Sequence, residues 1–265
     1  MATGVSKMHR SLRAGRFGRR SEEFVAKDHV EVEWQLEATD LDLAESWIKK
    51  HSPTSDLAAI PDSTKELLDA YYDTEDWRSY RAGYSLRVCR DGESAEETMT
   101  VLTPAEGALR QRRDISEPLK GNAKIPKVTR GPVGERVRRL AGARDLRLLF
   151  KVRTRRRVFE LLAVGADGNI AVGEIALDES EIFGETPAHL SRIEVEIDSS
   201  VSLHAGVAEF VDEMRDALGL RPTELAKFEL GLSAAGLNPS GASNLDLNGK
   251  RPAHHVTPLS PTSYV

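Results

Sequence analysis

Residues 30–37 read Val-Glu-Val-Glu-Trp-Gln-Leu-Glu, and this strict alternation of apolar and polar side chains constrains the fold more than any other feature. Successive side chains of a strand point to opposite faces, so the acids line one face and the apolar residues the other. An ordinary half-buried strand would put such acids in water. A second acidic alternation at 192–198 and a basic one at 150–159 favour a shared polar interior instead.

The basic alternation places Lys151, Arg153, Arg155 and Arg157 on one face, whereas Arg156 falls on the other face and is expected to be structural. Rows of carboxylates on some strands and rows of cations on others are what a site for metal ions and an anion requires. We therefore expect these strands to turn their charged faces toward one lumen. Their apolar faces would then point outward, toward covering helices.

Composition excludes several classes of protein. The chain has 265 residues and a formal net charge of −5, but the first twenty residues carry six cations and no acid, so the remainder is more acidic. An acidic body argues against nucleic acid as the main partner. Cys89 is the single cysteine, which excludes an internal disulfide and a CxxC metal site. No apolar run approaches the roughly 18 residues of a membrane span. We expect a soluble cytoplasmic protein.

Turn signals and hydrophobic periodicity predict about eight strands with a few helices between them, which is an α+β pattern. We expect residues 25–231 to form an eight-stranded antiparallel β-barrel with helices packed outside. Pro61 predicts a loop that ends before a strand at 67–74. Residues 1–24 are basic and residues 232–265 are rich in Pro, Ser, Gly and Asn, so both are expected to be disordered tails. The chain has no P-loop and no GxGxxG fingerprint that opens a helix.

Several short motifs follow one another in a characteristic order. They are Glu31-Val-Glu33, Tyr71-Tyr72-Asp73-Thr74, Leu86-Arg87-Val88, Lys151-Val-Arg153-Thr-Arg155-Arg-Arg157, Leu177-Asp178, Glu194-Val-Glu196 and Ala226-Lys227-Phe228. Each motif is weak alone, but the ordered set resembles the CYTH family, the triphosphate tunnel metalloenzymes, over residues 28 to about 231. The first motif stands where that family has E-x-E-x-K, and the next two resemble its "YYDT…LRxR" segment.

The resemblance implies an eight-stranded antiparallel tunnel that binds a triphosphate. Acidic residues would hold Mg²⁺ or Mn²⁺, and basic residues would hold the phosphates, which agrees with the ligand preferences of these ions and of guanidinium groups. The implied catalytic residues are Glu31 and Glu33. The implied metal ligands are Glu31, Glu33, Asp178, Glu194 and Glu196. The implied substrate-binding residues are Arg87, Arg112, Lys151, Arg153, Arg155 and Lys227.

Three positions depart from the family pattern. Gln35 stands where the first signature has lysine, Leu102 replaces the lysine of a "TxK" strand, and Cys89 replaces the second arginine of "LRxR" unless Arg90 substitutes through a bulge. Each lost charge-assisted contact would cost on the order of 1.5–3 kcal/mol of phosphate binding. We therefore expect lysine at positions 35 and 102 to tighten triphosphate binding. Cys89 itself is expected to be a passive replacement.

The residues and the resemblance together favour a metal-dependent hydrolase acting on inorganic, nucleoside or thiamine triphosphate. An adenylate cyclase of the class IV type is a second possible enzyme of the same metal-dependent kind. The alternative is a non-catalytic protein that binds polyphosphate or a nucleotide. The expected partner is a small-molecule triphosphate, with no nucleic acid and no membrane, and the expected state is a monomer or homodimer.

Overall fold

The computed structural model describes residues 27–51, 57–103, 108–119, 131–165, 168–198, 205–223 and 225–239. Nine strands and five helices follow one another within these residues. The strands are β1 (Lys27–Glu37), β2 (Leu57–Thr74), β3 (Tyr84–Asp91), β4 (Ser94–Val101), β5 (Leu109–Pro118), β6 (Leu146–Gly165), β7 (Gly168–Phe183), β8 (Ala188–Asp198) and β9 (Arg221–Pro222). The helices are α1 (Leu41–His51), α2 (Arg78–Arg81), α3 (Pro132–Ala141), α4 (Ala205–Leu218) and α5 (Lys227–Ala234).

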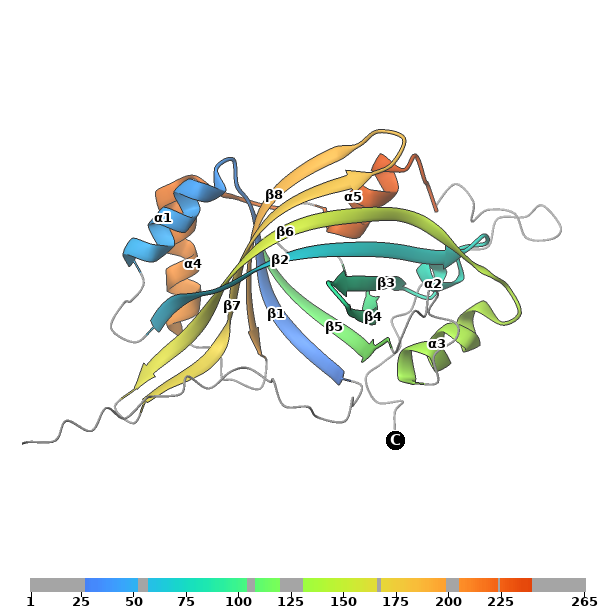
Figure 1. The fold of residues 1–265 in the computed structure, drawn as a ribbon, viewed down its shortest axis with the longest axis horizontal. Helices are drawn as coiled ribbons and strands as arrows, with labels where there is room; N and C mark the ends of the chain where they lie inside the picture. The colour runs from blue at the N-terminus through green and yellow to red at the C-terminus, as the bar shows by residue number, and fades with distance from the viewer. Residues whose placement is uncertain are drawn as a thin grey trace, which may run out of the picture.

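Strands β1 to β8 form one antiparallel sheet that closes into a ring (Figure 1). The order around the ring is β1-β5-β4-β3-β2-β6-β7-β8, and β8 pairs with β1 to complete it. The short strand β9 adds two residues beside β1. The predicted eight-stranded antiparallel barrel with outer helices is confirmed.

Helices α1 and α4 pack together on the outside of the ring (Figure 1). Beneath them lies a core that contains Trp34 and Leu36 of β1 and Ile193 and Val195 of β8. The apolar faces of both acidic strands therefore point outward, as predicted. Asp40 caps α1, because its carboxylate accepts hydrogen bonds from the second and third backbone N–H groups of the helix.

Helix α5 covers a different part of the ring. Phe228 and Leu232 of α5 pack on Phe150 of β6 in a second apolar cluster. A Cβ atom at Gly231 would lie 2.0 Å from the Phe150 ring, so glycine is what allows the helix to approach the strand this closely. Helix α3 covers part of β4 and β5 through a third cluster.

Two predicted boundaries differ from the structure. Strand β2 begins at Leu57 rather than near residue 67, and it continues through Pro61 by a shift of register between Pro61 and Ser63. A proline has no N–H to donate, and such an irregularity is where a strand tolerates one. The predicted domain end at residue 231 falls inside α5, whose Ala234 is buried. The predicted tail at 1–24 lies outside the described residues, as does the C-terminal tail from residue 240 onward.

Candidate active site

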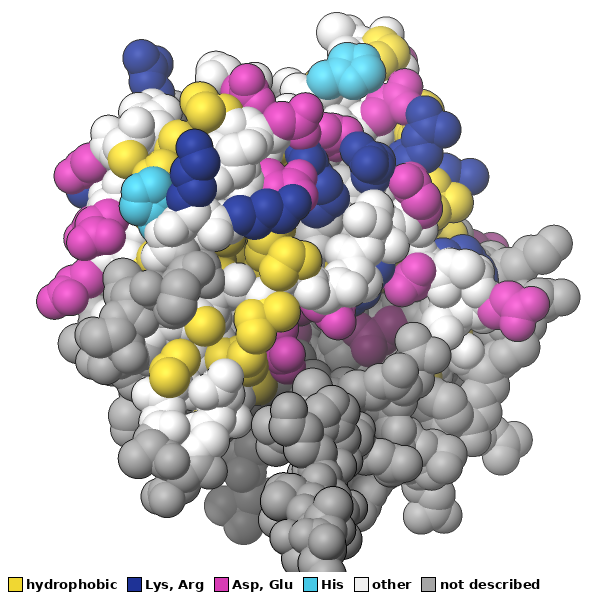
Figure 2. Space-filling view, turned by 60° about the vertical axis from the view of Figure 1, so that its left-hand side comes forward, with side chains coloured by type: hydrophobic (Ala, Val, Ile, Leu, Met, Phe, Trp, Pro, Cys, Tyr) yellow, Lys and Arg dark blue, Asp and Glu magenta, His cyan; other side chains and the backbone are white. Residues whose placement is uncertain are grey.

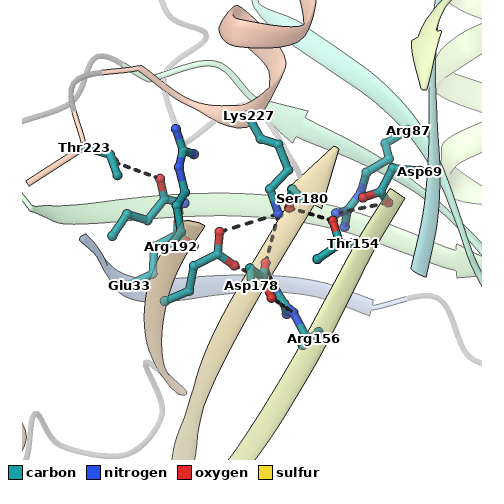
Figure 3. Close-up of polar contacts among 12 residues, drawn as sticks. Glu33, Asp69, Arg87, Thr154, Arg156, Asp178, Ser180, Arg192, Thr223 and Lys227 are labelled. Atoms are coloured by element: carbon teal, nitrogen blue, oxygen red, sulfur yellow. Dashed lines mark hydrogen bonds and ion pairs between the residues drawn. The ribbon is translucent and has the colours of Figure 1, made fainter. Parts of the chain in front are cut away.

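The lumen of the ring holds a cavity of about 680 Å³, which is lined by residues from seven strands and from the start of α5. Its charged lining combines both signs. The cations are Arg87, Arg110, Arg112, Arg156 and Lys227, and the carboxylates include Glu33, Asp114, Glu194 and Glu196. Figure 3 shows Glu33, Arg87, Arg156 and Lys227 among the side chains that come together from different elements.

Pairing of β1 with β8 brings the two acidic alternations together. Glu33 lies opposite Glu196, and Gln35 lies opposite Glu194. Glu33 and Glu194 are buried, and Glu196 is half-buried. These three predicted site residues line the same cavity. Glu31 occupies the next inward-facing position of β1, opposite Asp198 in the register, but its side chain lies outside the described residues.

Asp178 and Glu194 are bound by cations of the chain itself. Arg156 lies 2.8 Å from Asp178 and 2.5 Å from Glu194, and the Lys227 Nζ lies 3.0 Å from Asp178 and 3.7 Å from Glu194. Burial alone would lower the pKa of Lys227, but Glu194 and Asp178 outweigh it and raise that pKa. Lys227 therefore stays charged at neutral pH. In Figure 3 it extends from α5 toward Asp178.

Strand β5 supplies two further cations. The Arg112 Nη1 donates to Glu33 at 3.2 Å, and its Nε lies 3.1 Å from Asp114. Arg112 and Asp114 both line the cavity. Arg110 is a further cation of the cavity, outside the predicted set of site residues. Its signal is the same two-residue spacing, because Arg110, Arg112 and Asp114 share the inward face of one strand.

Arg87 lies on β3 and lines the cavity, with its Nη1 3.7 Å from the buried Asp69. Two positions further along β3, burial and then Asp69 raise the pKa of the Cys89 thiol to about 12. The thiol is therefore protonated at neutral pH, which agrees with a passive replacement. The β3 register has no bulge, so Arg90 does not take the place of the missing arginine. Leu102 lines the cavity without a charge.

Lys151, Arg153 and Arg155 do not reach the cavity, which corrects their predicted orientation. They do share a face of β6, but that face is the exposed outer one, where Arg153 lies 2.5 Å from Glu181. Arg156, expected to be structural, points into the lumen instead. The reason is the contact of Phe150 with Phe228, a residue of α5 that itself lines the cavity. Phe150 therefore faces inward, and by alternation so does Arg156, six residues further along the strand. On the face drawn in Figure 2, basic and acidic side chains are interspersed.

No group of three metal-ligating side chains comes together among the residues that the structure describes. Glu33 and Glu196 are nevertheless opposite each other at the cavity wall. Two carboxylates completed by substrate phosphates are a common arrangement for Mg²⁺, which rarely binds in an all-protein cage. The residues present therefore fit a metal that is shared with the substrate.

A closed antiparallel ring whose lumen carries carboxylates and cations together defines a tunnel protein. The family model of the CYTH domain matches residues 48–228, and the chain belongs to the CYTH family. No curated protein sequence matches the chain. No helix within the described residues is long and apolar enough to cross a membrane.

Two solved structures show the same fold. One is a candidate adenylyl cyclase from Hippeastrum, described as having a dominant triphosphatase activity, with 14% identity and a TM-score of 0.53 over 79% of this chain and 99% of that one. The other is a candidate adenylate cyclase from Bacillus halodurans, with 16% identity and a TM-score of 0.52 over 77% of this chain and 97% of that one.

Proposed function

We propose that this chain is a divalent-metal-dependent hydrolase of triphosphate compounds. The observation that carries the proposal is the cavity itself, in which a carboxylate pair on β1 and β8 lies beside cations from β3, β5 and α5. An elongated anion could touch both sets of groups at once. The triphosphatase activity described for the Hippeastrum protein supports hydrolysis over cyclisation.

The charge balance of the cavity supports a requirement for metal. Among the described residues, five cations lie in or against it, and they are accompanied by eight carboxylates. The carboxylates are Glu33, Asp69, Glu96, Asp114, Asp178, Glu194, Glu196 and Glu229. This leaves no surplus of positive charge for a ligand that carries about four negative charges. A divalent cation that enters with the substrate would restore the balance.

The proposed roles follow from these contacts. Glu33 and Glu196, with Glu31 beside them on β1, would hold Mg²⁺ or Mn²⁺, which supplies charge neutralisation at the phosphate oxygens. Arg87 and Arg112 would bind phosphate oxygens. Arg112 is already held by two carboxylates, so its guanidinium is oriented toward the cavity before substrate arrives.

Asp178 and Glu194 have a different role in this proposal from the one that the family resemblance implied. Each of them contacts both Arg156 and Lys227, so we assign them the role of positioning these two cations. The metal is assigned to Glu33 and Glu196, which lie opposite each other across the β1–β8 ladder. The arrangement keeps the charge of Lys227 inside the lumen, within reach of a phosphate group.

The test is a panel assay in which phosphate release is measured from tripolyphosphate, ATP and thiamine triphosphate with Mg²⁺, with Mn²⁺ and with a chelator. Metal-dependent release from at least one substrate is expected. Formation of a cyclic nucleotide from ATP would favour the cyclase instead. Binding by calorimetry without turnover would favour a non-catalytic triphosphate-binding protein. No binding of any of these ligands would refute all three functions.

A further inference from the structure

We infer that Gln35 is a positioning residue, which holds the start of α5 in place through Thr223 and so sets the position of Lys227 in the cavity. We call Gln35, Arg110 and Thr223 the latch. The claim that the latch holds the start of α5 in place does not depend on the proposed function. Its effect on substrate binding rests on the proposed function.

The latch joins the chain between α4 and α5 to the inside of the ring. Strand β9 pairs with the end of β1, and the Thr223 N–H then donates to the Gln35 carbonyl oxygen at 3.0 Å. Thr223 is 1% exposed, whereas Arg221, Pro222 and Leu225 around it are exposed, so Thr223 is the point at which this segment is anchored in the protein.

Side chains of the latch form a directional series of hydrogen bonds. Arg110 Nη2 donates to the Thr223 hydroxyl oxygen at 3.0 Å and to its carbonyl oxygen at 2.9 Å. The Thr223 hydroxyl donates to the Gln35 Oε1 at 3.3 Å. The Gln35 Nε2 donates in turn to the Glu33 carboxylate at 3.0 Å. The series therefore links the segment before α5 to a carboxylate of the proposed metal pair.

A glutamine suits this place better than a lysine does. The amide accepts one hydrogen bond and donates another, whereas an ammonium group can only donate. Lysine at position 35 would leave the Thr223 hydroxyl without its acceptor and would add a second cation beside Arg110. The missing lysine of the family signature is therefore not a simple loss, because Gln35 has contacts that lysine could not make.

The latch acts on Lys227 because only a short segment separates them. Lys227 is four residues after Thr223, and Arg192 fixes the same segment by donating to the Leu225 carbonyl oxygen at 2.7 Å. The Lys227 ammonium group then reaches Asp178 and Glu194. A shift of about 1 Å in a binding group is enough to weaken its interaction with a substrate substantially.

The test uses the full chain and compares Thr223→Val, which keeps the shape but removes the hydroxyl, with Thr223→Ser, which keeps the hydroxyl. Hydrogen–deuterium exchange of the α5 amides, measured without substrate, should be about five- to tenfold faster in the Val variant and near wild type in the Ser variant. Exchange in β7 should not change. Thr39→Val, at an exposed position, is the matched control.

The kinetic readout separates positioning from general destabilisation. Thr223→Val should raise KM for the best triphosphate substrate about fivefold with a smaller change in kcat, whereas a loss of folded protein would lower kcat and leave KM unchanged. Gln35→Met, which can neither donate nor accept through an amide, should reproduce both effects and serves as the second variant. If the α5 amides exchange at the wild-type rate in Thr223→Val and in Gln35→Met, the inference is overturned. A chain that hydrolyses nothing would count against the proposed function alone, because the exchange readout needs no substrate.

Discussion

Arg156 binds Asp178 through two hydrogen bonds, from Nε to Oδ1 and from Nη2 to Oδ2, each 2.8 Å long. The two residues are directly opposite each other in the β6–β7 register. Asp178 is fully buried and also contacts Lys227, so the lumen holds its charges in pairs. Removing one partner of such a pair leaves the other charge in a site of low dielectric constant, which is unfavourable.

Arg156→Leu should therefore lower the free energy of unfolding by about 3–5 kcal/mol, as measured by urea denaturation. The matched control is Arg155→Leu, which removes the neighbouring arginine from the exposed face and should change stability by no more than about 0.5 kcal/mol. Equal effects of the two substitutions would contradict the assignment of Arg156 to the lumen and of Arg155 to the outer face.

Glu33→Gln should abolish metal-dependent turnover and weaken Mn²⁺ binding in calorimetry by at least about tenfold, because a neutral amide is a poor ligand for a hard cation. Arg112→Ala should mainly raise KM, since the guanidinium would hold phosphate oxygens in the ground and transition states alike. Glu66→Gln, on the exposed face of β2, is the control and should leave both quantities unchanged. Full activity of the Glu33 variant would remove this carboxylate from the site.

The Lys227–Glu194 pair predicts the pH dependence of stability. Burial alone would raise the pKa of Glu194, but Lys227 and Arg156 outweigh it and hold the pKa well below its ordinary 4.5. The stabilisation from Glu194 is therefore present above pH 4.5 and is lost as the pH falls toward the lower folded pKa. Since the pKa of Lys227 is raised, its contribution is present below pH 10.5 and is lost only at more alkaline pH.

Lys227→Met should accordingly move the acid limb of the stability profile to higher pH, because Glu194 loses its strongest cation. Urea unfolding between about pH 3 and pH 11 measures this shift. An acid limb identical to that of the wild type would mean that the pair contributes nothing to folding.

Leu102→Lys should tighten tripolyphosphate binding by about tenfold, because it adds a cation to an uncharged part of the cavity wall. Gln35→Lys should weaken binding instead, since it disrupts the latch. This differs from the expectation drawn from sequence, in which lysine at either position restores affinity. Calorimetry on the two single variants decides between these outcomes, and tightening by Gln35→Lys would contradict the role of the latch.

The inward faces of β1 and β8 could be predicted from sequence because each strand has one charged face and one apolar face. Trp34 and Ile193 need cover from helices, so the opposite faces had to enter the lumen. The orientation of β6 could not be predicted in this way. Its alternation shows which residues share a face, but which face turns inward depends on the contact of Phe150 with Phe228, more than seventy residues away in the chain.

The contacts of the latch could not be predicted from the sequence either. Nothing in the local pattern around Thr223 shows that its hydroxyl lies between Gln35 and Arg110, because the three residues come from segments that only the closed ring brings together. From the sequence alone, the substitution at position 35 therefore shows only that a charge of the family motif is missing. The structure shows that the Gln35 side chain forms hydrogen bonds with Thr223 and Glu33.

Closure of the ring determines when the site can form during folding. The first strand, β1, completes the ring by pairing with β5 on one side and with β8 on the other. During synthesis, the edge of β1 that pairs with β8 therefore stays unpaired until β8, the last strand of the ring, has been synthesised. Because Glu33 meets Glu196 across the β1–β8 ladder, a partly folded chain has no assembled acidic wall. The proposed metal site and the closed barrel are completed in the same folding step.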